Sequence, residues 1–243
     1  MNAATLIEEL KKVGNPESAK KQLKFFKTYD GGYGEGDRFL GLKVPVIRAI
    51  AAPYTGLSLV EIEKLLDNPL HEVRFAGVVI MAKQGASKKV SAQQKKALYE
   101  LYLRRSDVIN NWDLVDVSCR DVVGVYLVDK PRGELYKLAV SPVIWQRRTA
   151  IVCTFAFLNR GQSADTYKLA ELLLQDTHDL MHKAVGWMLR EAGKRVGRDE
   201  LLLFLDKHAA TMPRTALRYA IEHLPTEQRQ HYMQLGKPPK SMV

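Results

Sequence analysis

The sequence has few of the features that mark secreted, metal-binding or membrane-spanning proteins. Its 243 residues include two cysteines and no C-x-x-C motif, which argues against a disulfide framework or a cysteine-rich zinc site. Both Cys119 and Cys153 lie among apolar residues, where a thiol acts as a small core side chain. No apolar run approaches the ~18 residues of a membrane span, and the start is amphipathic, unlike a signal peptide. We expect a soluble, cytoplasmic protein.

Sequence motifs for metal and nucleotide binding are also missing. His178 and His182 are four residues apart, but no Glu follows His178 and no H-E-x-x-H motif exists, so no metal is expected. The glycine-rich segment Gly31–Asp37 lacks a preceding strand pattern and a following Lys-Ser/Thr, which excludes a phosphate-binding loop. We expect a flexible loop at about residues 30–37 that leads into a helix starting near Pro45.

Basic residues exceed acidic ones in the composition. Lys and Arg number 37 against 27 Asp and Glu, which gives a net charge of +10 and a pI near 9.5. This imbalance favours a polyanionic partner such as nucleic acid or an acidic membrane. Charge that serves solubility alone is the alternative.

Apolar residues recur mainly at helical spacing, and strand-like alternation is scarce. Leu169, Leu172 and Leu173, followed by Leu180, Ala184 and Trp187, illustrate the intervals of three and four residues. Glycine and proline separate such stretches, leaving one or two short helices in each. The pattern predicts an all-α fold.

Four segments share one design, in which a cation is followed by small or apolar residues at the opening of a helix. Their cations are Arg74, Arg148, Lys183 and Arg214, separated by 74, 35 and 31 residues, with a further unit around Asn111 inside the first gap. A period near 35 residues predicts a right-handed α-solenoid of HEAT-like repeats, one domain over residues 1–243 with a tail at about 236–243. The cations would form a basic concave face, or each packs within its neighbour's turn.

A second group of polar residues opens a predicted helix at Asn111. If Asn111 is the N-cap, Trp112 and Asp116 lie four residues apart on one face. Asp113 in the first turn is explained by the helix dipole and capping alone. Asp116 sits between Val115 and Val117, where it either pairs with a buried arginine or serves a function.

Trp187 follows a glycine inside a predicted helix. Core packing explains the tryptophan by default. Gly186 weakens the helix, however, which indicates that something closely approaches the backbone there.

Several ordered segments together resemble the AlkD family of bacterial DNA glycosylases, from about residue 20 to residue 225. These segments are Phe25–Thr28, Gly34–Pro45, Asn111–Asp116, Trp145–Ile151 and Lys183–Glu191. The resemblance implies that Asp116, Trp112 and Trp187 excise cationic N3- or N7-alkylated purines, with Arg148 as a phosphate contact. An aromatic residue near the lesion is left open among Phe25, Phe26, Tyr29 and Tyr33.

The same resemblance implies a monofunctional hydrolase of base excision repair that needs no cofactor and acts as a bacterial, nucleoid-associated monomer. Its partner would be double-stranded DNA with alkylated bases, bound by basic side chains. We expect these to be Arg148, Lys183, Arg190, Arg214, Arg147 and Lys43.

Two other functions stay open. A non-catalytic relative would bind distorted or branched DNA in the same basic groove, although Asp116 argues against it. A HEAT scaffold for protein partners would have apolar grooves, and the basic residues argue against that.

Overall fold

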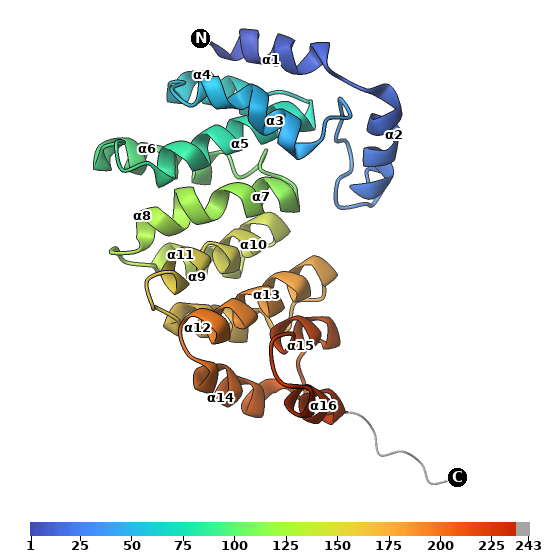
Figure 1. Ribbon diagram of the computed structural model, residues 1–243, viewed down its shortest axis with the longest axis vertical. Coiled ribbons are helices and arrows are strands. Elements are labelled where there is room, and N and C mark those ends of the chain that lie inside the picture. The colour runs from blue at the N-terminus through green and yellow to red at the C-terminus, as the bar shows by residue number, and fades with distance from the viewer. Residues whose placement is uncertain (237–243) are drawn as a thin grey trace. The chain divides into compact units, whose positions relative to one another are not determined.

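The computed structural model describes residues 1–236 and is built from helices (Figure 1). Within this range no strand forms, and the single bridge pairs Arg38 with Leu70. The all-α prediction is therefore confirmed. None of the helices in this range has the length and apolar character needed to cross a membrane. Beyond Gly236, the predicted tail lies outside the described residues.

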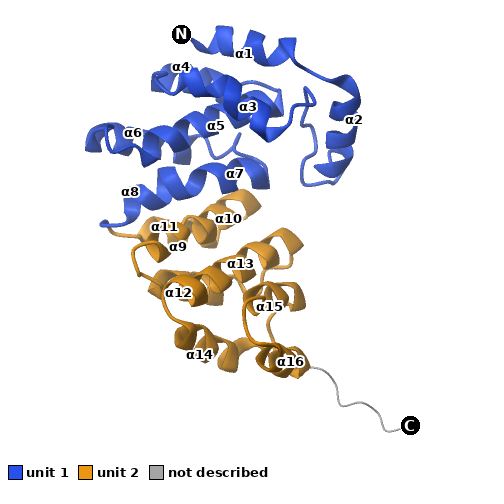
Figure 2. Cartoon of the chain, viewed as in Figure 1, with its two compact units in different colours: residues 1–130 blue, residues 131–243 orange. Residues whose placement is uncertain are grey.

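The chain divides into two compact units, residues 1–130 and residues 131–243 (Figure 2). The division falls at the Lys130-Pro131 step, one of the helix-breaking segments of the sequence. Proline cannot continue a helix, and it also disfavours the helical conformation in the residue before it. Each unit contains its own packed helices.

Helices of the first unit alternate with loops, the longest of which spans residues 26–43. Their bounds are α1 (Ala3–Lys12), α2 (Pro16–Phe25), α3 (Val44–Ala51), the 3₁₀ turn η1 (Ala52–Tyr54), α4 (Leu59–Leu66), α5 (His71–Ala86), α6 (Ala92–Arg104), α7 (Trp112–Cys119), the π-helical turn η2 (Arg120–Gly124) and α8 (Val125–Leu127).

Local signals explain where several of these helices begin. Asn2, Asn15, Ser58, Ser91 and Asn111 are N-caps whose side chains accept hydrogen bonds from the first turn, as such residues commonly do. The predicted helix start near Pro45 is confirmed, because α3 begins at Val44.

Helix α5 forms the core of the first unit. It packs against α3, α4 and α7, and every residue from His71 to Ala82 is buried. Gly85 continues this packing, because a Cβ there would lie 2.3 Å from the Asp121 carbonyl oxygen in η2. The side chains at the start of α5 are therefore held in fixed positions.

The second unit is also built from helices joined by loops. Their bounds are α9 (Gly133–Ala139), α10 (Ile144–Val152), α11 (Phe155–Leu158), α12 (Ala164–Leu173), α13 (Asp179–Arg195), α14 (Arg198–His208), α15 (Arg214–Ala220) and α16 (Thr226–Gln234).

The close approach predicted at Gly186 is confirmed, and helix α15 makes it. A Cβ on Gly186 would lie 2.4 Å from the Ala216 carbonyl oxygen and 2.5 Å from the Cβ of Tyr219. This glycine therefore lets α13 and α15 pack closely. The two cysteines are free and buried, which confirms their predicted place in the core.

Candidate functional site

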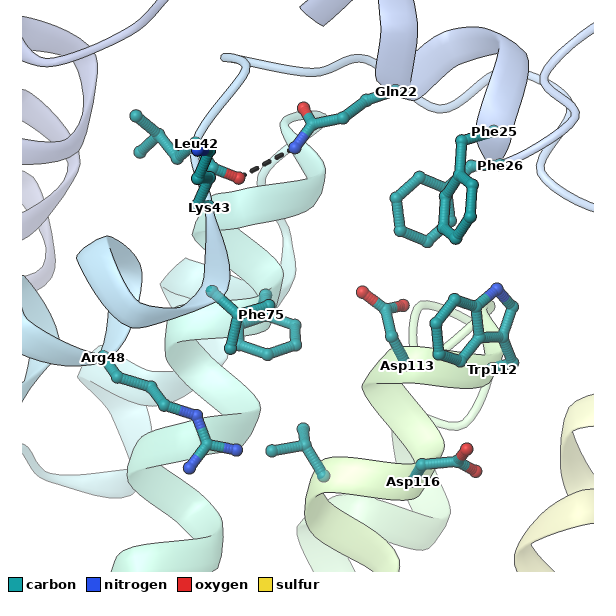
Figure 3. Close-up of a pocket in the computed structure, with 12 residues that line it drawn as sticks. Gln22, Phe25, Phe26, Leu42, Lys43, Arg48, Phe75, Trp112, Asp113 and Asp116 are labelled. Carbon is teal, nitrogen blue, oxygen red and sulfur yellow. Dashed lines mark hydrogen bonds between the residues drawn. The ribbon is translucent and has the colours of Figure 1, made fainter. Parts of the chain in front are cut away.

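A cavity of about 520 Å³ opens between α2, α3, α5 and α7 of the first unit (Figure 3). Most of its wall is apolar, and charged side chains stand at its edges. Its lining residues are Gln22, Phe25, Phe26, Leu42, Lys43, Val44, Arg48, Phe75, Trp112, Asp113, Asp116 and Val117.

Trp112 and Asp116 both line this cavity, which confirms that they share one face of α7. The Asn111 side chain accepts a hydrogen bond from the Trp112 backbone N–H at 2.9 Å, so the predicted N-cap is also confirmed. Asn111 is fully buried and donates to Asp37 Oδ2 at 3.3 Å. The start of α7 is thus fixed by its own cap and by a distant loop.

Two phenylalanines at the end of α2 approach the indole ring of Trp112 (Figure 3). The ring of Phe26 stacks on it with centroids 5.7 Å apart, and Phe25 meets it edge-on at 6.1 Å. Tyr29 is 61% exposed, and the Tyr33 hydroxyl donates to the Phe25 carbonyl. Of the four candidate aromatic residues, Phe25 and Phe26 are those that line the cavity.

A buried histidine, which the sequence analysis did not single out, joins two carboxylates behind this wall. The Nδ1 atom of His71 lies 3.0 Å from Asp37 Oδ2, and its Nε2 lies 2.8 Å from Asp113 Oδ2. Its ring packs against Phe26 and Phe39 with centroids 4.9 and 4.7 Å away. His71 therefore connects the aromatic group to the first turn of α7.

The electrostatics of this group make His71 a cation. Burial alone lowers its pKa, but the charge and hydrogen bond of Asp113, together with those of Asp37, raise the pKa of His71 to about 9. Burial likewise raises the pKa of Asp37, yet the hydrogen bond from His71 and the charge of Arg74 outweigh it and lower that pKa. At neutral pH His71 donates from both ring nitrogens.

Asp113 therefore has both a structural contact and a place on the cavity wall. Its Oδ2 accepts from His71, and its Oδ1 accepts from the Leu114 backbone N–H at 2.9 Å. The structural explanation from helix capping is confirmed by the second bond. The contact with His71 gives Asp113 a role that the helix dipole does not explain.

The glycine-rich loop delivers Asp37 to this group. Gly34 is buried, and a Cβ there would lie 2.3 Å from the Phe26 carbonyl oxygen and 3.4 Å from Asn111 Nδ2. Arg74, on α5, forms an ion pair with Asp37 and donates to the Asn68 carbonyl at 3.1 Å. The loop packs against the ends of two helices and places its last residue in the interior.

Two cations stand at the edge of the cavity. Lys43 is the N-cap residue of α3, and Arg48 lies on the same helix. Both side chains are exposed and line the cavity, and neither forms an ion pair with another residue in the range 1–236. They are available to an anionic ligand.

Three of the predicted DNA-binding arginines, all in the second unit, donate to backbone carbonyls. Arg148 is 5% exposed and donates to the Leu180 carbonyl at 2.5 Å. Arg214 donates to the carbonyls of Met233 and Leu235. Arg147 pairs with Asp176 at 2.6 Å and also donates to the carbonyls of Ser141 and Pro142. These contacts fit the alternative in which each cation packs within a neighbouring turn.

The remaining predicted residues of the second unit lie along α13. The side chain of Lys183 is 41% exposed and pairs with Asp179 at 2.7 Å. Arg190 forms ion pairs with Glu191 and Glu222. Trp187 is half-buried, with its ring centroid 6.2 Å from that of Phe155. Trp187 belongs to the second unit, whereas Trp112 and Asp116 belong to the first.

No group of three potential metal ligands comes together in the part of the chain that the structure describes. The His178 and His182 pair is engaged locally instead. His178 Nδ1 accepts from the Leu180 backbone N–H, and His182 Nε2 lies 2.5 Å from the Asp176 carbonyl.

The chain matches a family model and is similar to solved structures. A family model described as "DNA alkylation repair enzyme" matches residues 6–224. A solved structure described as a predicted DNA alkylation repair enzyme from Enterococcus faecalis is similar, with a TM-score of 0.67 and 17% identity. The match covers 88% of this chain and 97% of that chain, and at this identity it shows a shared fold. No curated protein matches.

Proposed function

Because the chain belongs to the DNA alkylation repair enzyme family, as its AlkD-like motifs predicted, we propose that it is a DNA glycosylase. The proposed reaction is hydrolysis of the N-glycosidic bond of cationic N3- or N7-alkylated purines in duplex DNA. The observation that carries the proposal is the placement of Asp116 and Trp112 on one face of α7, in the wall of the cavity.

The chemistry of this bond matches the chemistry of the wall. Cleavage of a glycosidic bond builds positive charge on the sugar. A fixed carboxylate such as Asp116 stabilises that charge and orients the attacking water. The faces of Trp112 and Phe25 attract a cation through their ring electrons. Asp116 and these rings therefore favour the transition state over the neutral sugar of the substrate.

A cationic purine also removes the need for an acid catalyst. An N7-alkylated purine already bears positive charge, so it leaves as a neutral base without protonation. Asp113 fits this scheme, because both of its carboxylate oxygens accept hydrogen bonds from the protein. In the proposed reaction Asp113 positions α7, and Asp116 faces the substrate.

Duplex DNA would be held by basic side chains from both units. Lys43 is exposed beside the cavity, and Lys183 is the most exposed of the candidates on α13. Arg147, Arg148, Arg190 and Arg214 complete the proposed set, with Trp187 as the second catalytic tryptophan. The right-handed solenoid and its basic concave face stay predictions.

A base-release assay tests the reaction. The protein is incubated with duplex DNA that contains N7-methylguanine, and free base is measured by chromatography beyond the spontaneous rate. The matched control is Asp116→Asn, which keeps the shape of the side chain and removes its charge. We expect release by the wild-type protein and a loss of about 100-fold or more in the variant.

Two outcomes contradict the proposal. Absence of release above the spontaneous rate excludes the glycosylase, and tight binding of branched duplexes in that case supports the non-catalytic alternative. Equal release by both proteins excludes Asp116 as the catalytic carboxylate.

A further inference from the structure

A second, smaller cavity adjoins the first and has more basic than acidic side chains in its wall. Its volume is about 190 Å³, and it lies between α3, α5, α7 and η2. Its lining residues are Arg48, Val79, Ala82, Lys83, Ala86, Val117, Arg120 and Asp121. Arg48 and Val117 line both cavities, so the two share a wall.

The second cavity has an excess of positive charge. Arg120 donates to both carboxylate oxygens of Asp121, at 2.9 and 2.7 Å, so these two residues compensate each other. Arg48 and Lys83 are exposed, and neither side chain has a hydrogen-bond or ion-pair partner among residues 1–236. Two uncompensated cations therefore face this cavity.

Arg48 stands where the two cavities meet. Figure 3 shows its guanidinium on the side of the first cavity opposite Trp112, reached from α3. The wall around Trp112 and Asp116 is aromatic and acidic, whereas the wall around Arg48 and Lys83 is basic. An alkylated nucleotide has the same two halves, a cationic base and sugar next to an anionic phosphate.

We propose that Arg48 and Lys83 bind the backbone phosphate adjacent to the nucleotide held in the first cavity. This inference rests on the proposed function and adds a DNA contact that the sequence analysis did not identify. A guanidinium offers two parallel N–H donors to phosphate oxygens, and an ammonium adds a point charge. The contact would fix the position of one nucleotide against Asp116.

The salt dependence of DNA binding tests the contact without requiring catalysis. Affinity for a duplex with a tetrahydrofuran abasic residue is measured between 50 and 200 mM salt for the wild type, Arg48→Met and Lys83→Met. Each lost phosphate contact should reduce the slope of log affinity against log salt by about 0.9. The matched control is Lys168→Met, which removes an exposed lysine on α12 that has no ion-pair partner among residues 1–236 and lines neither cavity.

Neutral phosphate analogues locate the contact on the DNA. Methylphosphonate is placed at one position at a time around the abasic residue, and binding by the wild type is compared with that of the Arg48→Met/Lys83→Met double variant. We expect one adjacent position at which the analogue weakens wild-type binding by up to about 5-fold and leaves the double variant unaffected. The Lys168→Met protein should respond like the wild type.

Two results would overturn the inference. The first is a salt slope in both single variants equal to that of the Lys168→Met control. The second is a reduced salt slope in the variants together with no methylphosphonate position that affects the wild type and the double variant differently. That result would mean that the two cations attract DNA in general and do not bind one phosphate. Base release is measured separately, so failure of the proposed reaction and failure of this contact are distinguishable.

Discussion

The Nε2 atom of His71 lies 2.8 Å from Asp113 Oδ2, although 42 residues separate them in the chain. The contact joins the first residue of α5 to the second residue of α7. Trp112 precedes Asp113, and Asp116 follows it by less than one helical turn. The position of the proposed catalytic wall therefore depends on a buried cation that does not line the cavity itself.

Replacing His71 by phenylalanine should destabilise the protein, because it leaves Asp37 and Asp113 without their shared donor. Phenylalanine largely keeps the ring contacts with Phe26 and Phe39, so the loss of stability measures what the charge of His71 contributes. We expect the free energy of unfolding to fall by about 3 kcal/mol, measured by urea denaturation. A double-mutant cycle with Asp113→Asn should give a coupling above about 1 kcal/mol, and simple additivity would contradict the contact.

Stability should also decline in mild alkali. The pKa of His71 is raised from 6.5 to about 9 in the folded protein, so its contribution is fully present below pH 6.5 and is lost as the pH rises through 9. The contribution lost is up to about 3 kcal/mol. Urea midpoints from pH 6 to 10 should fall more steeply in the wild type than in His71→Phe, and parallel profiles would refute the assignment.

The contribution of Asp37 to stability has the opposite pH dependence, because it is lost in acid. Because the pKa of Asp37 is lowered in the folded protein, its contribution is present above its ordinary pKa of 3.8 and is lost as the pH falls through the folded value. We expect Asp37→Asn to flatten the acid limb of the same denaturation profile. An unchanged limb would show that Asp37 is not a stabilising anion.

Arg148 and Lys183 are both proposed to contact DNA, but they should differ in how much they contribute to stability. Arg148 is buried and donates to the Leu180 carbonyl, so Arg148→Met should cost about 1–3 kcal/mol of stability. Lys183→Met removes an exposed charge and should change stability by less than about 0.5 kcal/mol, while reducing the salt slope of DNA binding by about 0.9. Both quantities are measured for both variants, and the reverse pattern would contradict these assignments.

Gly186 should tolerate no side chain. A Cβ there meets the Ala216 carbonyl and Tyr219, so Gly186→Ala should force α15 away from α13 and cost about 1–3 kcal/mol. Gly133→Ala is the matched control, since a Cβ there has no neighbour within 4 Å. The midpoint of thermal unfolding is measured for both variants. Equal midpoints would mean that α15 can move away from α13 without loss of stability.

The sequence predicted features that depend on neighbouring residues. The cap at Asn111 and the common face of Trp112 and Asp116 follow from spacing within a single helix turn. The close approach at Gly186 was predictable because glycine is unfavourable inside a helix. Its partner was not, since α15 begins 28 residues later in the chain.

Features that depend on distant residues were missed. His71 acquires its role from Asp37 and Asp113, which are 34 and 42 residues away, and a single histidine gives no local signal of such a pair. The buried contact of Arg148 likewise depends on Leu180, 32 residues further on. Spacing identified the recurrent cations but could not tell which of them reach solvent.

Trp112, Asp116 and Arg120 follow one another at intervals of four residues along α7 and into η2. An aromatic ring, an acid and a base thus succeed each other along a single ridge, from the first cavity to the second. Inserting one residue between Trp112 and Asp116 would turn the later members by about 100° around the helix axis. Repair activity in relatives of this chain should therefore be sensitive to the number of residues between the tryptophan and the acid.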